Sequence, residues 1–264
     1  MPSIHTKQNK DLPFGIFRNK RLLAPYHDVA ASVFRNNKSA NLDEIFLASA
    51  RDGDYDRIQT LVRPHDQSSM NIDVKDRRYG NSAVIWAAKR GHIKILQLLL
   101  KHGADVTLRN YDNKTALDEA SPGIQQILVA TVTSGGSSPR RLMQAAWQGN
   151  SHAVEQILSE RRVIDINCQN ADGMTPLLLA ACDLSLFEKI RSLLTNYDPV
   201  RVVSLLLQHR ADPSACDSEG RTSLHHAALS KASAALNLIG LILGSGASIG
   251  IGHSSVVNVH IPIP

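Results

Sequence analysis

Apolar and polar positions alternate along the chain in two repeating patterns, and each is typical of a short amphipathic helix. In the first, a hydroxyl residue precedes a compact apolar run that ends in paired alanines, as in NSAVIWAA (81–88) and MTPLLLAA (174–181). In the second, aliphatic residues recur three or four positions apart, as in ILQLLLKHGADV (95–106). Residues at this spacing share one face of a helix. The two patterns together predict pairs of helices that pack through their apolar faces.

The residues at the ends of these patterns agree with helix boundaries. Pro176 falls in the expected first turn of a helix, where its missing N–H costs nothing. Gly103 and Gly246 follow aliphatic stripes, at the place where a left-handed residue commonly ends a helix. The hydroxyl residues placed to cap the first helix of a pair are Ser82, Thr115, Thr175 and Thr222. The side chains that we expect in a continuous core are Ile95, Leu98, Leu99 and Leu177.

The helix pairs recur as units. The stretch YGNSAVIWAA (79–88) returns with changes in DNKTALDEAS (112–121), DGMTPLLLAA (172–181) and EGRTSLHHAA (219–228). An aliphatic run follows, often with Gly-Ala-Asp. This pattern resembles the ankyrin-repeat family, whose unit of about 33 residues combines Thr-Pro-Leu-His with a later Gly-Ala-Asp. The best-formed unit matches almost without gaps, and about six candidate units lie within residues 42–250.

The resemblance implies an all-α solenoid of helix–turn–helix units joined by β-hairpin-like loops. The uneven spacing of the units adds two irregularities. The third unit, from Asn110, is shortened in the connection between its helices. The fifth unit contains an insertion at about 184–197, where apolar residues at helical spacing predict an extra helix or a helix extension.

The shortened third unit and the stretch TSGGSSPR that follows it divide the repeats into two arrays. A flexible Gly/Ser linker at 132–139 is expected to couple the arrays only weakly. The other predicted segments are a flexible N-terminal arm (1–41), a first array (42–131) and a second array (140–250) of about three units each, and a tail outside the repeat pattern (251–264). The sixth unit is either truncated or alternatively terminated, and the sequence leaves both open.

Positive charge is concentrated at the beginning of the chain. Residues 1–40 contain seven Lys or Arg and two Asp or Glu, whereas the remaining residues contain 22 of each sign. The net charge of +5 therefore belongs to the arm. A repeat region without basic excess argues against nucleic-acid binding. The arm includes RNKR (18–21), which is compatible with nuclear import or a phosphate contact, although a solvated arm is the simpler interpretation.

Cysteine usage and hydropathy indicate the compartment. The three cysteines, Cys168, Cys182 and Cys216, are far apart and odd in number, so neither a disulfide framework nor a zinc finger is predicted. The first residues lack the apolar segment of a signal peptide. The most apolar run, AALNLIGLILG (234–244), is too short to span a bilayer. We expect a cytoplasmic or nuclear protein without membrane insertion.

The adjacent histidines His225 and His226 raise the question of a metal or catalytic site. Neighbouring residues on a helix point about 100° apart, so the two imidazoles cannot easily hold one metal ion. His225 occupies the motif histidine of the family, for which the resemblance implies structural hydrogen bonds to neighbouring turns. The chain also lacks a His-Glu-x-x-His motif, a phosphate-binding loop that ends in Gly-Lys-Ser/Thr and a Gly-x-Ser-x-Gly elbow. We predict no catalysis, no cofactor and no metal.

The resemblance implies that partners bind to hairpin tips and to the exposed face of each first helix. The matching positions in this chain are Arg78, Tyr79, Asn81, Trp86, Lys89, Arg90, Tyr111, Asp112, Trp147, Gln148, Met174, Glu219 and Arg221. Large aromatic residues are enriched at binding hot spots. For Trp86 the alternative is packing between helices, and for Trp147 it is covering a broken stack. The tip DRRYGN (76–81) makes a positive patch with Lys89 and Arg90, which favours a partner with an acidic segment.

The sequence therefore predicts a monomeric protein-binding module that acts as an adaptor or scaffold. Stacked units would form a rigid surface that presents a few variable side chains to other proteins. One alternative is that the chain is the partner-recruiting part, or a truncated form, of a larger regulatory or enzymatic protein. The other alternative is a nuclear regulator that uses the basic arm.

Overall fold

The computed structural model describes residues 40–62, 70–130, 137–160 and 164–246. The predicted tail 251–264, nearly all of the predicted arm 1–41 and most of the predicted linker 132–139 lie outside these residues. The chain divides into a unit of residues 1–41 and a unit of residues 42–264. The described helices belong to the second unit, apart from the first two residues of the first helix.

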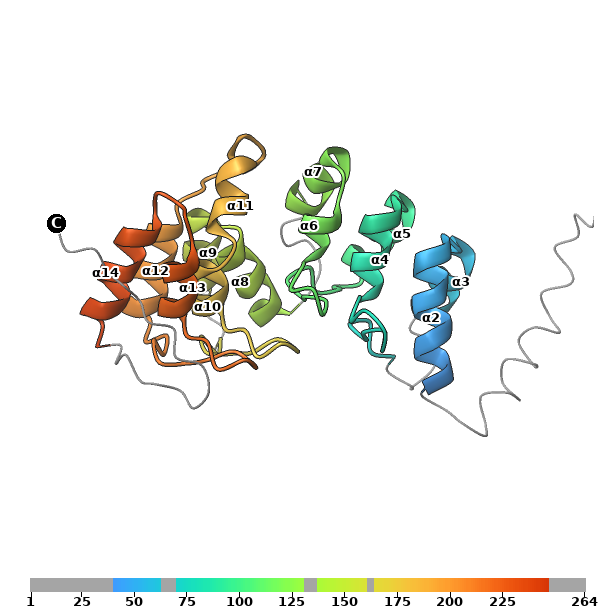
Figure 1. Cartoon of the computed structure of the whole chain (residues 1–264), viewed down its shortest axis with the longest axis horizontal. Coiled ribbons are helices and arrows are strands. Elements are labelled where there is room, and N and C mark those ends of the chain that lie inside the picture. The colour runs from blue at the N-terminus through green and yellow to red at the C-terminus, as the bar shows by residue number, and fades with distance from the viewer. Residues whose placement is uncertain (1–39, 63–69, 131–136, 161–163, 247–264) are drawn as a thin grey trace, which may run out of the picture. The chain divides into compact units, whose positions relative to one another are not determined.

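Pairs of helices follow one another in chain order, and each pair corresponds to one predicted repeat (Figure 1). The pairs are α2 (Ala40–Asp52) with α3 (Tyr55–Val62), α4 (Ala83–Arg90) with α5 (Ile93–Lys101), α6 (Ala116–Glu119) with α7 (Pro122–Ala130), α8 (Ser138–Trp147) with α9 (Ser151–Ser159), α10 (Pro176–Ala181) with α12 (Pro199–Gln208), and α13 (Ser223–Leu229) with α14 (Ala235–Gly244). The fifth pair is interrupted by α11 (Leu184–Lys189) and the 3-10 helix η1 (Arg191–Leu193). The described residues contain no strand, so the predicted all-α repeat fold is confirmed, with its short third unit and its helical insertion.

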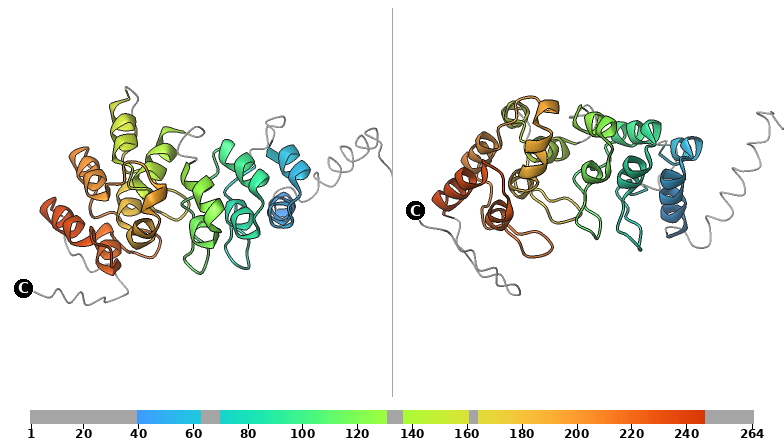
Figure 2. Two further views of the ribbon diagram at one scale, coloured as in Figure 1. Left: turned by 90° about the horizontal axis from the view of Figure 1, so that it is seen from above. Right: turned by 45° about the horizontal axis from the view of Figure 1, so that its top comes forward.

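Extended turns connect the units, and those before α4, α6, α10 and α13 protrude on the same side of the helix pairs (Figure 2). Two of them close with a single β-bridge, between Lys75 and Ser82 and between Cys216 and Thr222. These turns are the hairpin tips that the resemblance implied.

Side-chain caps begin α4, α6 and α10 as predicted. Ser82 Oγ accepts a hydrogen bond from Ile85 N at 3.4 Å. Thr115 and Asp118 cap each other, because Thr115 Oγ1 accepts from Asp118 N at 3.4 Å while Asp118 Oδ2 accepts from Thr115 N at 2.8 Å. Thr175 Oγ1 accepts a hydrogen bond from Leu178 N at 3.3 Å, which caps α10. These bonds satisfy N–H groups that have no partner within the helix.

The predicted helix ends are also confirmed. Gly103 and Gly246 follow α5 and α14 with φ of 78° and 90°, in the left-handed region where an added Cβ would be strained. Pro176 is the first residue of α10.

Burial confirms the repeat register, with one exception. Ile95, Leu99 and Leu177 are at most 1% exposed, as predicted. Leu98 is only partly buried, because its neighbours on α5 fill the apolar face and Leu98 lies at its edge. The register that places Leu177 in the core therefore holds.

The insertion packs back onto the earlier units. Phe187 of α11 is 1% exposed, and its ring meets the Trp147 ring edge-on, with the centroids 5.0 Å apart. The partly buried insertion residues that pack against the same hydrophobic cluster are Leu186, Ile190, Leu193 and Leu194. That cluster also contains Leu128 and Val129 of α7. The insertion thus covers the end of the shortened third unit.

Candidate functional site

The tip of the second unit is organised by the carboxylate of Asp76. Its Oδ1 accepts hydrogen bonds from Arg78 N at 2.9 Å and Tyr79 N at 2.6 Å. Its Oδ2 accepts from Asn81 N at 3.1 Å and from the indole Nε1 of Trp86 at 3.0 Å. One carboxylate therefore fixes the whole turn and ties it to α4, so the side chains of the tip are held before any partner arrives.

Aromatic and cationic groups stack on this fixed turn. The Arg78 guanidinium carbon lies 5.0 Å from the centroid of the Tyr79 ring. The Tyr79 ring meets the Trp86 ring edge-on at 5.9 Å, and the guanidinium of Arg90 lies 6.0 Å from the Trp86 ring. Cation–π contacts of this kind are worth about 0.5–1 kcal/mol at exposed sites. Tyr79 is nevertheless 45% exposed and can contact a partner.

The tip of the third unit lies directly against the second. Tyr111 N donates to Tyr79 O at 2.9 Å. Gly80 has φ of 69°, and a Cβ added there would lie 2.7 Å from the Tyr111 ring, so only glycine permits this approach. Tyr111 remains 69% exposed. Two exposed tyrosines from neighbouring units thus stand side by side.

The charges around the two tyrosines are mostly positive. Lys89 and Lys114 pair with Glu119, at 3.0 Å and 3.5 Å. Burial alone would raise the pKa of Glu119, but the two lysines lower it overall. In the part of the chain that the structure describes, Arg78 and Arg90 have no carboxylate within 4.0 Å, and neither does the neighbouring Arg77.

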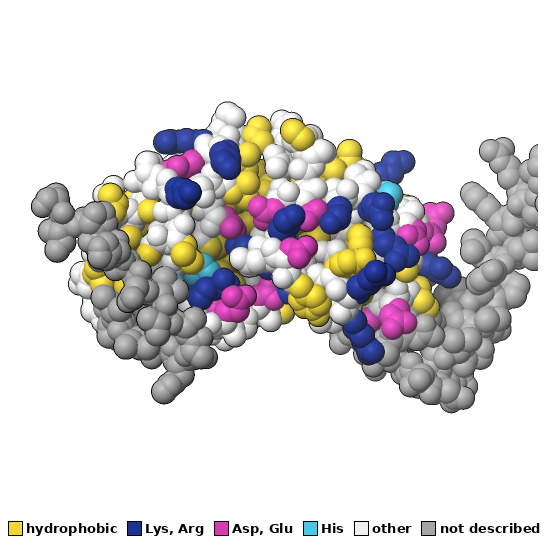
Figure 3. Space-filling model, viewed as in Figure 1, with side chains coloured by type: hydrophobic (Ala, Val, Ile, Leu, Met, Phe, Trp, Pro, Cys, Tyr) yellow, Lys and Arg dark blue, Asp and Glu magenta, His cyan; other side chains and the backbone are white. Residues whose placement is uncertain are grey.

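We define the basic tip as Arg77, Arg78, Tyr79, Arg90 and Tyr111. Figure 3 shows Lys and Arg side chains gathered next to exposed hydrophobic side chains on the face that carries the turns of the second and third units. The basic tip retains Arg77, Arg78, Tyr79 and Arg90 of the patch that the sequence predicts, leaves out Lys89, which pairs with Glu119, and adds Tyr111.

The structure divides the predicted binding positions into two groups. The exposed or half-exposed ones are Arg78, Tyr79, Lys89, Arg90, Tyr111, Asp112, Glu219 and Arg221. A role in partner binding stays a prediction for these. The buried ones are Asn81, Trp86, Trp147, Gln148 and Met174, none more than 8% exposed. For these five, the predicted surface exposure is wrong.

Each buried position has a partner inside the molecule. Asn81 Oδ1 accepts from Asn110 Nδ2 at 2.9 Å, which joins the second and third tips. Gln148 Nε2 donates to the backbone oxygen of Val129 at 3.5 Å, and Met174 belongs to the hydrophobic cluster. Both tryptophans are packed rather than exposed, Trp86 against its own turn and Trp147 against Phe187 of the insertion.

The sixth unit pairs its charges internally. Arg221 contacts Asp217 and Glu219, each at 2.9 Å. Burial alone would raise the pKa of Asp217, but hydrogen bonds from His226 and Arg221 hold it far below its usual range. This tip therefore offers a partner less free charge than the basic tip.

The two adjacent histidines have separate structural roles. His225 Nδ1 lies 2.8 Å from Thr222 Oγ1 and accepts from Thr222 N at 3.2 Å, which caps α13. His226 Nε2 lies 3.0 Å from Asp217 Oδ2. His225 has a structural role as predicted, but its contacts are with Thr222 at the start of its own helix rather than with a neighbouring turn. Among the residues the structure describes, no group of three His, Cys, Asp or Glu side chains is arranged to hold a metal ion.

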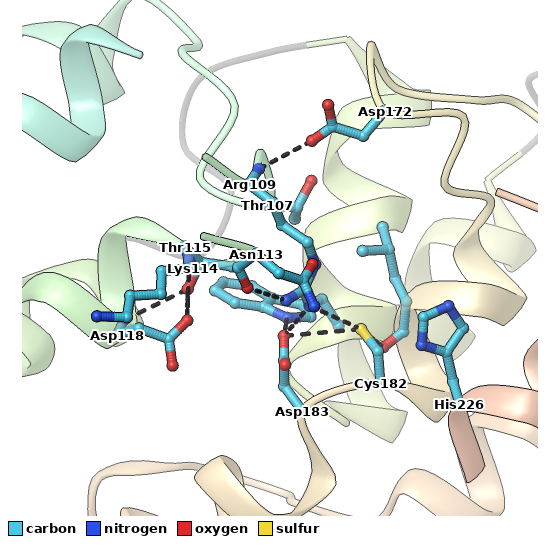
Figure 4. A network of polar contacts seen from close by, with 12 residues as sticks. Thr107, Arg109, Asn113, Lys114, Thr115, Asp118, Asp172, Cys182, Asp183 and His226 are labelled. Atoms are coloured by element: carbon cyan, nitrogen blue, oxygen red, sulfur yellow. Dashed lines mark hydrogen bonds and ion pairs between the residues drawn. The ribbon is translucent and has the colours of Figure 1, made fainter. Parts of the chain in front are cut away.

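A buried polar cluster joins the third-unit turn to the fifth unit, with Arg109 reaching from Asp172 toward Asp183 (Figure 4). The Arg109 guanidinium pairs with Asp183, and their side chains are 11% and 16% exposed. Trp147 Nε1 donates to Asp183 Oδ2 at 2.9 Å. Arg109 N donates to Asp172 Oδ2 at 2.8 Å, and Lys75 Nζ pairs with Asp172 and donates to Arg109 O. Side chains from four units therefore share one network.

This network and the shared hydrophobic cluster contradict the weak coupling expected from the sequence. Arg140, at the start of α8, adds an ion pair to Asp73 at 2.6 Å and a hydrogen bond to Gly103 O. Ion pairs and hydrogen bonds, as well as apolar contacts, thus cross the boundary between the two predicted arrays.

The cluster also contains the buried thiol of Cys182, which Arg109 contacts. Burial raises the pKa of Cys182 well above its usual range, with Asp183 as a further cause. Burial alone would lower the pKa of Arg109, but Cys182 and Asp183 raise it. Burial also raises the pKa of Cys168, to about 11. Thiols that stay protonated at neutral pH are poor nucleophiles and poor metal ligands.

Of the helices in the described residues, none is both long and apolar enough to cross a membrane.

A family model described as ankyrin repeats matches residues 45–130 and 142–251, well over half of the chain. The chain is 25% identical over 201 residues to the "Putative ankyrin repeat protein YahD" of Escherichia coli (strain K12), a match that covers 70% of this chain and 88% of the relative. A crystal structure of an ankyrin repeat domain from Acinetobacter baumannii AYE is 24% identical, with 77% of this chain and 98% of that chain covered and a TM-score of 0.33.

Two further relatives are much longer than the matched region. The human "Transient receptor potential cation channel subfamily A member 1" is 23% identical over 200 residues, which are 75% of this chain and 14% of the channel. The "Probable E3 ubiquitin-protein ligase XBOS32" of Oryza sativa subsp. japonica is 35% identical over 77 residues, which are 29% of this chain and 15% of the ligase. The chain thus spans a small part of these two proteins.

Proposed function

The chain belongs to the ankyrin-repeat family, and from that premise we propose that it is a non-catalytic protein-binding module, an adaptor or scaffold, that binds through its basic tip. Ankyrin repeats are in general protein-interaction modules, because stacked units hold variable side chains on a rigid framework. The proposal places the binding contacts on the second and third units.

The observation that supports the proposal most is the pair of exposed tyrosines on adjoining tips. Tyr79 and Tyr111 are 45% and 69% exposed and are held by the hydrogen bond between their backbones. Tyrosine and arginine are the residue types most often found as interface anchors. Because the carboxylate of Asp76 already fixes the turn, binding would cost little ordering entropy.

The chemistry of the basic tip favours an acidic segment of a partner protein. Arg77, Arg78 and Arg90 have no carboxylate within ion-pair distance among the described residues, so a partner's Asp or Glu can supply it. The residues after position 40 contain 22 positive and 22 negative side chains. This balance favours a protein partner over a nucleic-acid partner. The proposal includes a monomer in the cytoplasm or nucleus, and both of these points rest on the sequence.

A second candidate function is that of a recruiting region within a larger regulatory or enzymatic protein. The matches to 14% of the human channel and 15% of the rice ligase favour it, because in both proteins the similar region is one part among others. The basic tip would serve the same purpose in either case.

Replacing Arg78 and Tyr79 together by alanine is expected to weaken partner binding at least about tenfold, because two interface anchors are lost. The fold should be unchanged, since both side chains are exposed. Partners recovered from cell extract by the wild-type chain and by the variant, quantified by mass spectrometry at low and high salt, measure this effect.

The matched control is Arg201→Ala with Leu236→Ala, which removes one exposed arginine and one exposed apolar side chain elsewhere. A partner that disappears with the tip variant and stays with the control supports the proposal. Equal recovery by the wild type and both variants, with the same salt sensitivity, would show that the basic tip is not the binding site.

A further inference from the structure

A second surface feature exists because of the insertion. A hollow of about 630 Å³ lies between α11 and the segment that follows α13, and it is lined by Ser185, Glu188, Lys189, Leu229 and Lys231. α11 belongs to the insertion, which regular repeats lack. We call this feature the insertion hollow.

The two walls of the insertion hollow are held together. Glu188 Oε1 accepts hydrogen bonds from Ser233 N at 2.8 Å and from Ser233 Oγ at 2.7 Å. These bonds tie α11 to the connection between α13 and α14. The spacing of the walls is therefore set within the chain and does not depend on a ligand.

The lining combines one apolar side chain with free positive charge. Leu229, at the end of α13, is 63% exposed. Lys189 and Lys231 form no ion pair within the described residues, whereas the carboxylate of Glu188 keeps its charge but is turned to Ser233, which donates two hydrogen bonds to it. A single exposed leucine is ordinary on a protein surface. A leucine in a hollow that two unpaired lysines also line presents a combination that an apolar side chain next to a carboxylate would complement.

The insertion hollow is open to solvent, and this property limits the kind of ligand that it can bind. Sites for small molecules bury most of the ligand surface. The insertion hollow is open to solvent and lined by five residues, so a small molecule bound there would keep much of its surface in water. A side chain that projects from a protein segment fits such a site better, because the rest of the segment makes its contacts outside.

We propose that the insertion hollow is a second binding site, which accepts a peptide segment of a partner protein with a leucine-sized apolar side chain between carboxylates. The inference rests on the proposed function in that both treat the chain as a protein-binding module, but it concerns different residues. The apolar side chain packs on Leu229, and the flanking carboxylates pair with Lys189 and Lys231.

The test is a fluorescence-anisotropy titration with a labelled peptide that has a central leucine flanked by glutamates. The titration uses the full chain with Arg78→Ala and Tyr79→Ala, so that the basic tip cannot contribute. In this background Leu229→Ala should weaken binding about fivefold, as expected for a partly buried leucine contact. Lys189→Gln with Lys231→Gln should weaken it about tenfold at low salt and flatten the salt dependence.

Leu236→Ala is the matched control, because Leu236 is 78% exposed on α14 and does not line the insertion hollow. It should bind the peptide as tightly as its parent. A peptide in which the central leucine is replaced by alanine should bind weakly to every variant. Absence of peptide binding, or equal binding by the Leu229, lysine and Leu236 variants, would overturn the proposal. A basic-tip variant that keeps its partners would instead count against the proposed function and would leave this titration unaffected.

Discussion

Phe187→Ala is expected to lower the free energy of unfolding by about 3–5 kcal/mol, the range for removing a buried aromatic side chain. Phe187 is 1% exposed, and its ring lies 5.0 Å from the Trp147 ring and 6.4 Å from the Tyr197 ring. The substitution removes the apolar contact through which the insertion covers the third unit, and it leaves a cavity. Urea unfolding followed by circular dichroism measures the loss.

The control for this prediction is Leu236→Ala. Leu236 is 78% exposed, and exposed substitutions usually change stability by about 0.5 kcal/mol or less. If Phe187→Ala unfolded at the same urea concentration as this control, the insertion would not be part of the core.

Arg109→Met is expected to cost about 3–5 kcal/mol, because it leaves the Asp183 carboxylate as a buried charge without its ion-pair partner. Both side chains are less than a fifth exposed, at 11% and 16%. Trp147 Nε1 would still donate to Asp183, but a neutral donor does not compensate the charge. Thermal and urea unfolding of the single variant measure the effect.

Two further variants make this prediction specific. Arg201→Met removes an exposed pair with Glu155 at 3.4 Å and should cost at most about 1 kcal/mol. Asp183→Asn in the Arg109→Met background removes the unpaired charge and should restore part of the loss, since asparagine tolerates the φ of 53° at this position. An Arg109→Met loss no greater than that of Arg201→Met would mean that the buried cluster does not join the units.

The features that the sequence predicts correctly are those that depend on neighbouring residues in the chain. The hydroxyl caps at Ser82 and Thr175 and the left-handed Gly103 are determined within a few positions, and each is found where the pattern places it. His225 differs, because the resemblance implies hydrogen bonds to neighbouring turns, whereas the imidazole contacts Thr222 three residues before it. Local chemistry is sufficient for such features.

The features that the sequence misses depend on which units become neighbours. Trp147 stands at a position that is exposed in a regular repeat, but here Phe187 of the insertion and Asp183, just before it, cover the indole. Arg109 and Asp183 are 74 residues apart, and no motif links them. Asp76 is a partial exception, because an aspartate before a turn often accepts hydrogen bonds from the backbone that follows.

The same cause explains the error about coupling. A Gly/Ser stretch after a shortened unit predicts a loose junction, since in repeat proteins each unit contacts its neighbours through short segments. The insertion lies later in the chain, and its packing against α7 becomes evident only in the folded structure. The exact division into arrays at 42–131 and 140–250 stays a prediction.

The central claim, that a partner binds across the tips of the second and third units, is tested most directly by hydroxyl-radical footprinting. The measurement compares the full chain alone with the chain bound to a partner that the Arg78→Ala/Tyr79→Ala variant fails to recover. Tyr79 and Tyr111, at 45% and 69% exposure, should both become protected, while Leu236 should react at the same rate in both states. Unchanged reactivity of both tyrosines in a saturated complex would contradict the account.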